Sequence, residues 1–284
     1  EAKQGEGNTP TYRGVAYVVL DRFDVGDYGN RIPQLQFEVI RPIGRLSGQV
    51  RAVSLLPGAI EYGLSPVIVT RTQRPGEEEA VNRNVLFAGT DIAASLDELQ
   101  AICPRLEHVA LISTWFGDDL RAGSCRVRPA VTDAAETGFS SAWVVSGLPR
   151  AEAPVVSYHD GGAAYGGTPS DRSVLDAIAE IKARGLSVTL YPFMMMDIAT
   201  DNTLPDPEGR AAQPPYPWRG RITCDPAPGR DGSADRTAGA RAQVAAFCGT
   251  ARSADFSAEA DTVRFSGAGD WGYRRLVLHY AHLA

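Results

Sequence analysis

The sequence predicts an α/β protein whose larger part consists of parallel βαβ units, preceded by a mostly antiparallel β segment. From residue 90 onward, short apolar segments alternate with amphipathic helical segments, a pattern typical of parallel sheets. Before residue 90, short strand-like segments follow one another without helices between them. About three or four strands fit residues 90–284, whereas a closed (β/α) barrel needs eight, so these units would not close a barrel by themselves.

Bulk composition places the chain among ordinary globular proteins. Of its 284 residues 44% are hydrophobic, and its net charge is −6. This acidic balance gives no electrostatic footprint for nucleic acid. No apolar run approaches the roughly 18–20 residues that span a bilayer. Because the first residues include neither a Met nor a signal peptide, we expect the chain to begin inside a longer polypeptide.

Four segments before residue 90 predict strands. Residues 14–20 form an almost continuous apolar run, and residues 34–40 alternate between apolar and polar. Residues 50–55 and 67–72 are shorter candidates. The Pro-Gly and glutamate run at 75–79 is most simply a solvated loop.

The first βαβ unit begins at residue 90. Thr90 or Asp91 can cap a helix whose apolar side chains fall on one stripe. A buried strand is predicted at 108–115 and a second one at 142–145, with a helical turn at 133–138 between them.

The clearest helical signal lies between residues 168 and 185. Thr168 takes the N-cap position, Pro169 the first helical position and Asp171 the capping-box position. Gly185 follows the last apolar residue of the stripe, as at many helix ends. A core strand is expected next, at 186–193.

The last third of the chain contains a long irregular segment. Residues 197–239 are rich in Pro, Gly and Asp and too long for an ordinary connection, so we expect a functional excursion or a docking loop. A short helix is predicted at 243–247, and Asp270 is expected to cap a final helix. The four cysteines form no C-x-x-C pair and are expected as isolated thiols, with a disulfide as the alternative.

Carboxylates at predicted strand ends are the candidate catalytic groups. Glycoside hydrolysis needs two of them, about 5–9.5 Å apart. The candidates are Asp118, Asp119, Asp160 and Asp197. Sugar binding, turn formation, helix capping and ion pairs with Arg121 or Arg126 are the alternatives.

Aromatic and imidazole side chains near these carboxylates are candidates for binding a glycan or shaping a loop. They are Trp115, His159, Tyr165, Tyr216 and Trp218. Aromatic faces pack well on sugars, but Trp115 and Trp143 suit a protein core equally, and Trp218 could anchor a subunit contact. The His159–Asp160 pair has no Ser or Cys nucleophile in a recognisable elbow. The neighbouring glycine-rich run lacks the lysine and spacing of a phosphate-binding loop.

Two sets of motifs resemble a known family. The sequence YRGVAY at 12–17, followed by YGNRIP at 28–33, resembles the final strands of the tail-hub domain in siphophage-type tail-tip proteins. Residues from about 90 onward resemble the TIM-barrel-like, glycoside-hydrolase-related domain of gene transfer agents, which are phage-like particles that package host DNA. The motifs that carry this second resemblance lie at 113–123, 159–171, 191–197, 216–222, 271–275 and 279–281.

The resemblance implies a division of the chain. Residues 1–50 would end a tail-hub β domain, and 51–89 would form a β linker segment. Residues 90–284 would be the first half of the barrel, with a long insertion at about 197–240. In the family, the acid/base Glu and its partner carboxylate come from later strands. They would lie past residue 284, so the resemblance assigns no catalytic residue, metal or cofactor to this chain.

The resemblance also implies a function. The chain would be a structural hub component of the tail tip or baseplate, assembled in the bacterial cytoplasm and released with the particle. Its partners would be other tail-tip proteins and identical copies in a homotrimer ring, with a cell-surface glycan as a further candidate. One alternative is a glycoside hydrolase acting on peptidoglycan or capsule glycans. Another is a glycan-binding module without turnover.

Overall fold

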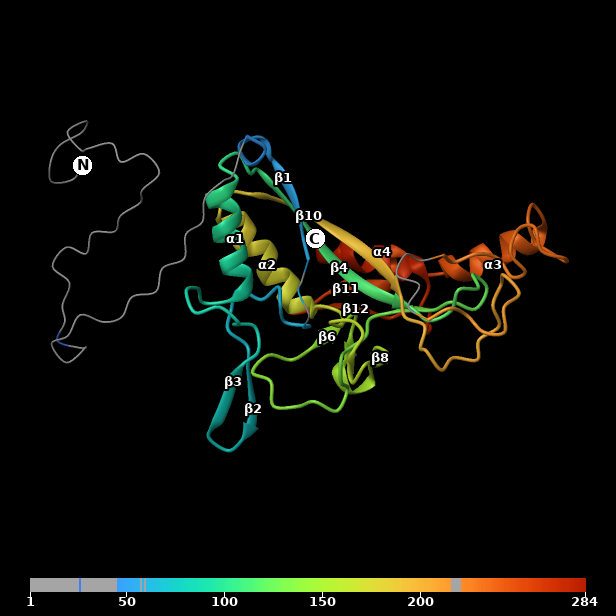
Figure 1. The fold of residues 1–284 in the computed structure, drawn as a ribbon, viewed down its shortest axis with the longest axis horizontal. Coiled ribbons are helices and arrows are strands. Elements are labelled where there is room, and N and C mark those ends of the chain that lie inside the picture. The colour runs from blue at the N-terminus through green and yellow to red at the C-terminus, as the bar shows by residue number, and fades with distance from the viewer. Residues whose placement is uncertain (1–25, 27–44, 57, 59, 216–220) are drawn as a thin grey trace. The chain divides into compact units, whose positions relative to one another are not determined.

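A parallel sheet with helices packed on one face organises the described part of the chain (Figure 1). The computed structural model describes residues 26, 45–56, 58, 60–215 and 221–284. All elements named below lie within the unit Ile40–Ala284. The strands expected at 14–20 and 34–40, and the tail-hub motifs at 12–17 and 28–33, fall outside the described residues.

The sheet contains three parallel strands in chain order. β1 (Ala52–Leu55) pairs with β4 (His108–Gly117), and β4 pairs along its whole length with β10 (Ser187–Met196). A short strand, β5 (Val127–Arg128), runs antiparallel to the end of β4. The strands expected at 108–115 and 186–193 are therefore confirmed and extend two or three residues further. The segment expected as a β linker contributes β1 to this sheet.

One helix lies between each pair of consecutive parallel strands. α1 (Asp91–Ile102) begins as expected after Thr90, whose hydroxyl accepts a hydrogen bond from Ala93 N at 3.4 Å. α2 (Asp171–Ala183) has Ser170 as its N-cap, because the Ser170 hydroxyl accepts from Ser173 N. The expected cap at Thr168 is wrong, since the Thr168 hydroxyl is used to donate to the carbonyl of Thr114 on β4.

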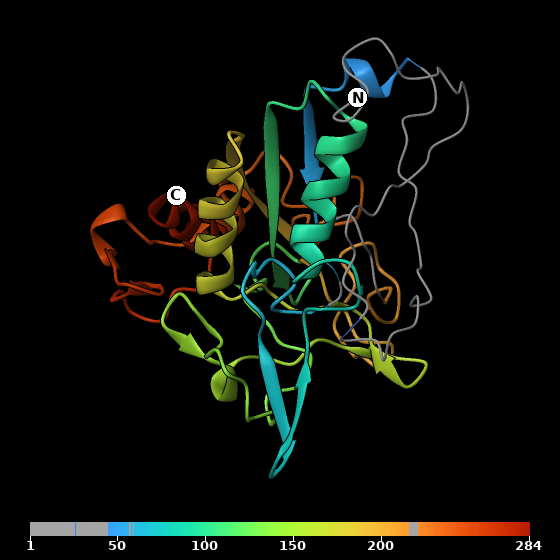
Figure 2. The same cartoon turned by 90° about the vertical axis from the view of Figure 1, so that its left-hand side faces the viewer.

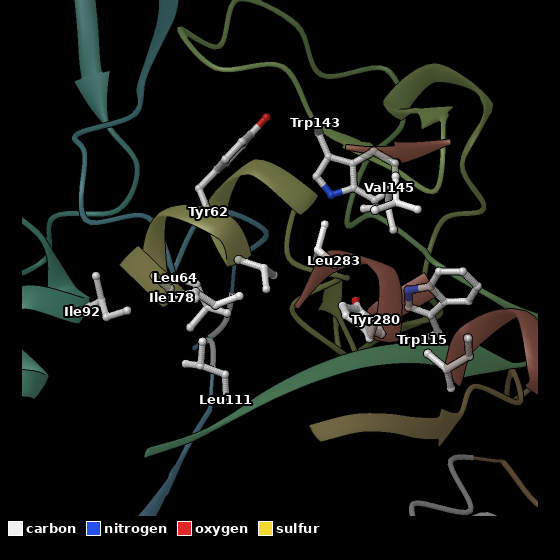
Figure 3. Close-up of a cluster of buried hydrophobic side chains, with 14 of the residues drawn as sticks. Tyr62, Leu64, Ile92, Leu111, Trp115, Trp143, Val145, Ile178, Tyr280 and Leu283 are labelled. Atoms are coloured by element: carbon white, nitrogen blue, oxygen red, sulfur yellow. The ribbon is translucent and has the colours of Figure 1, made fainter. Parts of the chain in front are cut away.

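The core lies between the sheet and these helices (Figure 3). Side chains alternate along β4, so Val109, Leu111 and Trp115 share one face, and all three are buried. They belong to one cluster with apolar residues of the helices, including Ile92, Leu96, Val174, Ile178, Ile181, Leu276, Tyr280 and Leu283. Burial of this face against helices explains the apolar spacing in the sequence.

The opposite face of the sheet is only partly covered by the described residues. Ile112 on β4 and Tyr191 on β10 are register partners on this face, and Tyr191 is 48% exposed. Phe193 lies beside Tyr191, with ring centroids 5.8 Å apart, and is only partly buried. A small cluster of Phe116, Ala130 and Val156 covers this face near the carboxyl ends of the strands.

Four antiparallel hairpins form separate two-stranded sheets, and Figures 1 and 2 show the first of them, β2–β3, projecting from the other elements. They are β2 (Thr70–Arg74) with β3 (Glu77–Ala80), β6 (Val144–Val145) with β7 (Leu148–Pro149), β8 (Tyr158–His159) with β9 (Gly162–Ala163), and β11 (Phe256–Ala258) with β12 (Val263–Phe265). The glutamate run is therefore an exposed strand rather than only a loop.

Two more helices follow β10. α3 (Ala238–Cys248) is longer than the helix expected at 243–247, because Thr237 caps it and accepts from Gly239 N and Ala240 N. α4 (Tyr273–Leu283) starts after Gly272 rather than Asp270. Short 3₁₀ turns occur at Ser47–Gln49, Arg150–Glu152 and Ser253–Asp255.

Three further expectations can be compared with the structure. Residues 133–138 form bends rather than the expected helical turn, with the Asp133 carboxylate accepting from Ala135 N. The strand expected at 142–145 is shorter. All four cysteines are free thiols. The described residues form no closed barrel, and no helix among them is both long and apolar enough to cross a membrane.

Candidate functional site

The carboxyl ends of β4 and β10 lie side by side and lead into two of the candidate carboxylates. Gly117 is the register partner of Met196, and the backbone N–H of Asp197 donates to Gly117 O at 2.9 Å. Asp118 and Asp197 are therefore the first residues beyond two neighbouring strands. Functional side chains of parallel sheets gather at this edge. We define the candidate site as this edge together with the loop 129–170 beside it.

Asp118 is exposed to solvent but already has two donors. One carboxylate oxygen accepts from Arg126 N at 2.8 Å, and the other lies 3.2 Å from the guanidinium of Arg128. The Asp118 side chain is 40% exposed. Arg128 belongs to β5, so this short strand brings the positive charge to the end of β4.

Asp119 is buried and fully hydrogen-bonded. Its oxygens accept from the backbone and guanidinium of Arg121 and from Gln213 Nε2, which lies at 2.7 Å. Burial alone would raise the pKa of the Asp119 carboxyl, but these donors outweigh it and the pKa is lowered. Gln213 also accepts from Leu120 N, so Asp119 ties the long excursion to the end of β4.

Asp197 has one satisfied and one unsatisfied oxygen. Its Oδ2 accepts from Ser157 N at 2.8 Å, which connects the end of β10 to the loop before β8. Its Oδ1 is buried and has no hydrogen-bond partner among the described residues. A buried carboxylate oxygen without a donor is costly, so Asp197 is the candidate carboxylate least explained by structure alone.

The His159–Asp160 pair lies at the tip of the β8–β9 hairpin. Asp160 has a φ of 49° and Gly161 a φ of 82°. Positive φ at both central positions is the requirement of a two-residue type I′ turn, which favours Asp-Gly. The Asp160 side chain is 90% exposed and lies 3.4 Å from His159 Nε2. Turn geometry therefore accounts for Asp160.

The aromatic candidates divide between core and edge. Trp115 is fully buried and packs against Trp271 and His279, with ring centroids 5.9 and 5.3 Å away. Tyr165 lies at the candidate site, where its hydroxyl donates to Met196 O at 2.8 Å and its ring packs on Phe116. Tyr216 and Trp218 lie outside the described residues.

A buried polar network that the sequence did not predict joins α2 to α4. Asp171 Oδ1 lies 2.9 Å from His279 Nε2, and both side chains are fully buried. Asp171 Oδ2 accepts from Thr262 Oγ1 at 2.6 Å and from Ser146 N at 3.1 Å. Asp171 therefore does not complete a capping box. The only sequence signal for this network is His279, a polar residue among the apolar positions of the final helix.

A second unpredicted network lies after β1. Glu61 is buried, and its Oε1 accepts from Thr132 N at 2.7 Å and from the Thr132 hydroxyl at 2.9 Å. Its Oε2 lies 3.5 Å from Arg150, whose guanidinium sits 4.7 Å from the ring centroid of Phe139. This network holds the loop 129–170 against the segment that follows β1.

The site provides acceptors but no complete catalytic constellation. Asp118 and Asp197 are neighbours, and each has at least one backbone N–H as a donor. Among the described residues, no group of three His, Cys, Asp or Glu side chains is placed to hold a metal ion. The edge can accept hydrogen bonds from hydroxyl groups, as sugar ligands require. No known family model and no curated protein matches the sequence.

Proposed function

We propose that this chain is a structural component of the tail tip or baseplate of a phage-like gene transfer agent particle. The tail-hub motifs at 12–17 and 28–33 and the motifs distributed from 113 to 281 support this role. The particle would use it in attachment to the host envelope, or in its penetration, during DNA delivery. Other tail-tip proteins, and identical copies in a homotrimer ring, are the proposed partners.

The same proposal assigns the parallel sheet to a TIM-barrel-like domain related to glycoside hydrolases. Three features support it: the strands are parallel, their spatial order is their chain order, and consecutive strands are joined through helices. The partly exposed face that carries Ile112 and Tyr191 would then be the interior face of the barrel. A doubly wound sheet, by contrast, reverses its strand order at a switch point.

The observation that favours a structural role over a catalytic one is how the strand-end carboxylates are bonded. Asp119 is held by Arg121 and Gln213, and Asp118 by Arg126 N and Arg128. Asp160 forms a hairpin turn. Carboxylates that are committed to backbone and guanidinium donors hold loops in place, whereas an acid/base pair needs groups free to exchange protons with substrate.

The test is incorporation into particles. An epitope-tagged chain is expressed in the bacterium that encodes it, and released particles are separated on a density gradient and labelled with gold against the tag. We expect label at one tail end, and we expect deletion of the gene to abolish DNA transfer until the gene is restored. A chain that stays out of the particle fraction, in cells whose DNA transfer survives the deletion, would contradict the proposal.

The alternative is a glycan-directed activity, as a hydrolase or a binding module. The Asp118 carboxylate, 40% exposed at the carboxyl end of β4, favours it, because an accessible carboxylate can accept hydrogen bonds from sugar hydroxyls. Asp197, whose Oδ1 has no partner among the described residues, follows the neighbouring strand. Purified peptidoglycan is incubated with the chain, and both pelleted protein and released reducing sugar are measured. An active site predicts that Asp197→Asn lowers binding or turnover, while Asp160→Asn in the exposed turn does not. Absence of binding and of release by the unaltered chain would exclude both forms of this alternative.

A further inference from the structure

An open groove lies between α3 and the segment that leads into α4, away from the candidate site. Its volume is about 730 Å³, within the range of ligand-binding clefts. Its lining residues are Ala240, Arg241, Val244, Ala245, Cys248, Gly249, Thr250, Arg252 and Arg274. The lining therefore combines small apolar side chains from one helix with guanidinium groups from three separate places in the chain.

The apolar part of the groove belongs to a helix that packs on the core through Phe247 and is otherwise largely exposed among the described residues. No residue of α3 is buried, and Val244 is 50% exposed. A helix of eleven residues is marginal on its own in water, so its apolar face is expected to gain stability from a covering surface. Val244 and Ala245 provide that face inside the groove.

The positive charges of the groove are not neutralised within the described part of the chain. Arg241, Arg252 and Arg274 are exposed, and no carboxylate there lies within ion-pair distance of their guanidinium groups. Most other described arginines do form such pairs, for example Arg172 with Asp176 and Arg184 with Glu180. In a chain of net charge −6, unpaired positive charge thus gathers around one apolar surface.

The walls of the groove are held in place by Asp270. Its carboxylate accepts hydrogen bonds from Thr250 N, from the Thr250 hydroxyl at 2.8 Å, from Ala251 N at 3.0 Å and from Gly272 N at 3.0 Å. A Cβ at position 272 would lie 2.6 Å from Cys248 O, so the two segments pack closely. The groove is therefore largely formed before any partner binds, which lowers the entropic cost of binding.

We infer that this groove binds an acidic amphipathic segment of a partner protein. Carboxylates of the segment would pair with Arg241, Arg252 and Arg274, since guanidinium groups bind carboxylates through paired hydrogen bonds. Apolar side chains of the segment would cover Val244 and Ala245. An inorganic anion would leave this apolar surface uncovered, which is why a peptide suits the groove better. The inference depends only on the groove and stands whether or not the particle role is correct.

The first experiment measures the charge requirement. A fluorescein-labelled synthetic helix with glutamates on one face and leucines on the other is titrated with the chain and followed by fluorescence anisotropy. The matched peptide carries Gln at every Glu position. We expect the acidic peptide to bind about tenfold more tightly, because each of three exposed ion pairs contributes modestly. Equal affinity for the two peptides would overturn the inference.

Variants place the peptide in the groove. The triple variant Arg241→Gln, Arg252→Gln, Arg274→Gln should remove the preference for the acidic peptide. The control variant Arg45→Gln, Arg83→Gln, Arg105→Gln removes the same charge from exposed arginines elsewhere and should retain it. Val244→Ser should lower the affinity of the chain for both peptides severalfold. Circular dichroism of each variant verifies folding. Equal losses in the two triple variants would mean that net charge alone drives binding and would overturn the inference.

Cys248 provides a direct readout of occupancy. It lines the groove, whereas Cys224 does not, and both are free and partly exposed. Bound peptide should slow alkylation of Cys248 by iodoacetamide, measured by mass spectrometry, and leave Cys224 unchanged. If the peptide binds but alkylation of Cys248 is not slowed, the peptide binds outside the groove and the inference is wrong. A second copy of the chain is the competing occupant, and sedimentation velocity tests for it. Concentration-dependent dimers that the triple variant of the groove arginines abolishes would assign the groove to a second copy and reject a partner protein.

Discussion

Asp171 and Asp119 are both buried carboxylates, but the donors around them connect different parts of the chain. Asp171 at the start of α2 contacts His279 of α4 and Thr262 beside β12, so it joins segments far apart in sequence. Asp119 contacts Arg121 and Gln213 and holds the excursion to the end of β4. The importance of each depends on how many donors are left unpaired when the carboxylate is removed.

Removing the Asp171 carboxylate should strongly destabilise the protein. Asp171→Ala leaves His279, the Thr262 hydroxyl and Ser146 N buried without their acceptor. We expect a loss of about 3–5 kcal/mol in the free energy of unfolding, as for other buried pairs that lose one partner. Urea denaturation measures it. Asp176→Ala in the same helix, whose partner Arg172 is exposed, should cost less than about 1 kcal/mol; similar losses in both variants would contradict this.

The Asp119 carboxylate should make stability depend on pH in acid. Its folded-state pKa is lowered from the ordinary value near 3.8, so the folded state favours the charged form. The stabilisation is complete above the unfolded-state pKa and is lost as the pH falls through the lower folded-state pKa. Asp119→Asn should cost about 1–3 kcal/mol near neutral pH. The difference from the unaltered protein should shrink below about pH 3.8, and a difference that persists unchanged there would refute the assignment.

At the scale of elements, regular segments could be predicted and irregular ones could not. The apolar spacing in α1, β4 and β10 placed these elements to within a few residues, because each buries one continuous face in the core. The N-cap of α2 was misplaced, since Thr168 bonds to the distant Thr114 carbonyl instead. Short hairpins such as β6–β7 depend on contacts from distant segments, which local spacing in the sequence cannot reveal. The hydrogen-bond partners of Glu61 and Asp171 are also distant in sequence and could not be predicted for the same reason.

Asp270 should act as a clamp between α3 and α4. Burial alone would raise the pKa of its carboxyl, but hydrogen bonds from Thr250, Gly272 and Ala251 lower it. Asp270→Asn should cost about 1–2 kcal/mol, comparable to the loss of a helix cap. It should also speed amide hydrogen exchange in α3 more than in α1, which hydrogen-exchange mass spectrometry measures. Equal acceleration in both helices would show that Asp270 acts on global stability alone.

At the scale of the whole described unit, the two faces of the sheet differ in how far other elements bury them. Trp115 lies beneath α4, with no exposed surface, while Tyr191 on the other face is 48% exposed. Sequence periodicity identified both strands as core elements, but it could not show that the described chain leaves one face partly open. In the TIM-barrel-like proposal, the partly open face would be the interior of the barrel.

Substitutions on the two faces should therefore have unequal effects. Trp115→Ala removes a buried indole from the main core and should cost about 3–5 kcal/mol. Tyr191→Ala should change the free energy of unfolding by about 0.5 kcal/mol or less if its face is open in solution. Thermal and urea unfolding of the isolated chain measure both losses. A large loss for Tyr191→Ala would mean that another surface covers this face.

The agreement between the chain order and the spatial order of β1, β4 and β10 has a consequence for synthesis. Each new strand is added to the edge of the sheet formed by the strands before it, so no finished part of the sheet has to reopen. β1, α1 and β4 can assemble while the residues of α2 and β10 are still inside the ribosome. A nascent chain of this kind can therefore bury its apolar strands progressively as it leaves the exit tunnel.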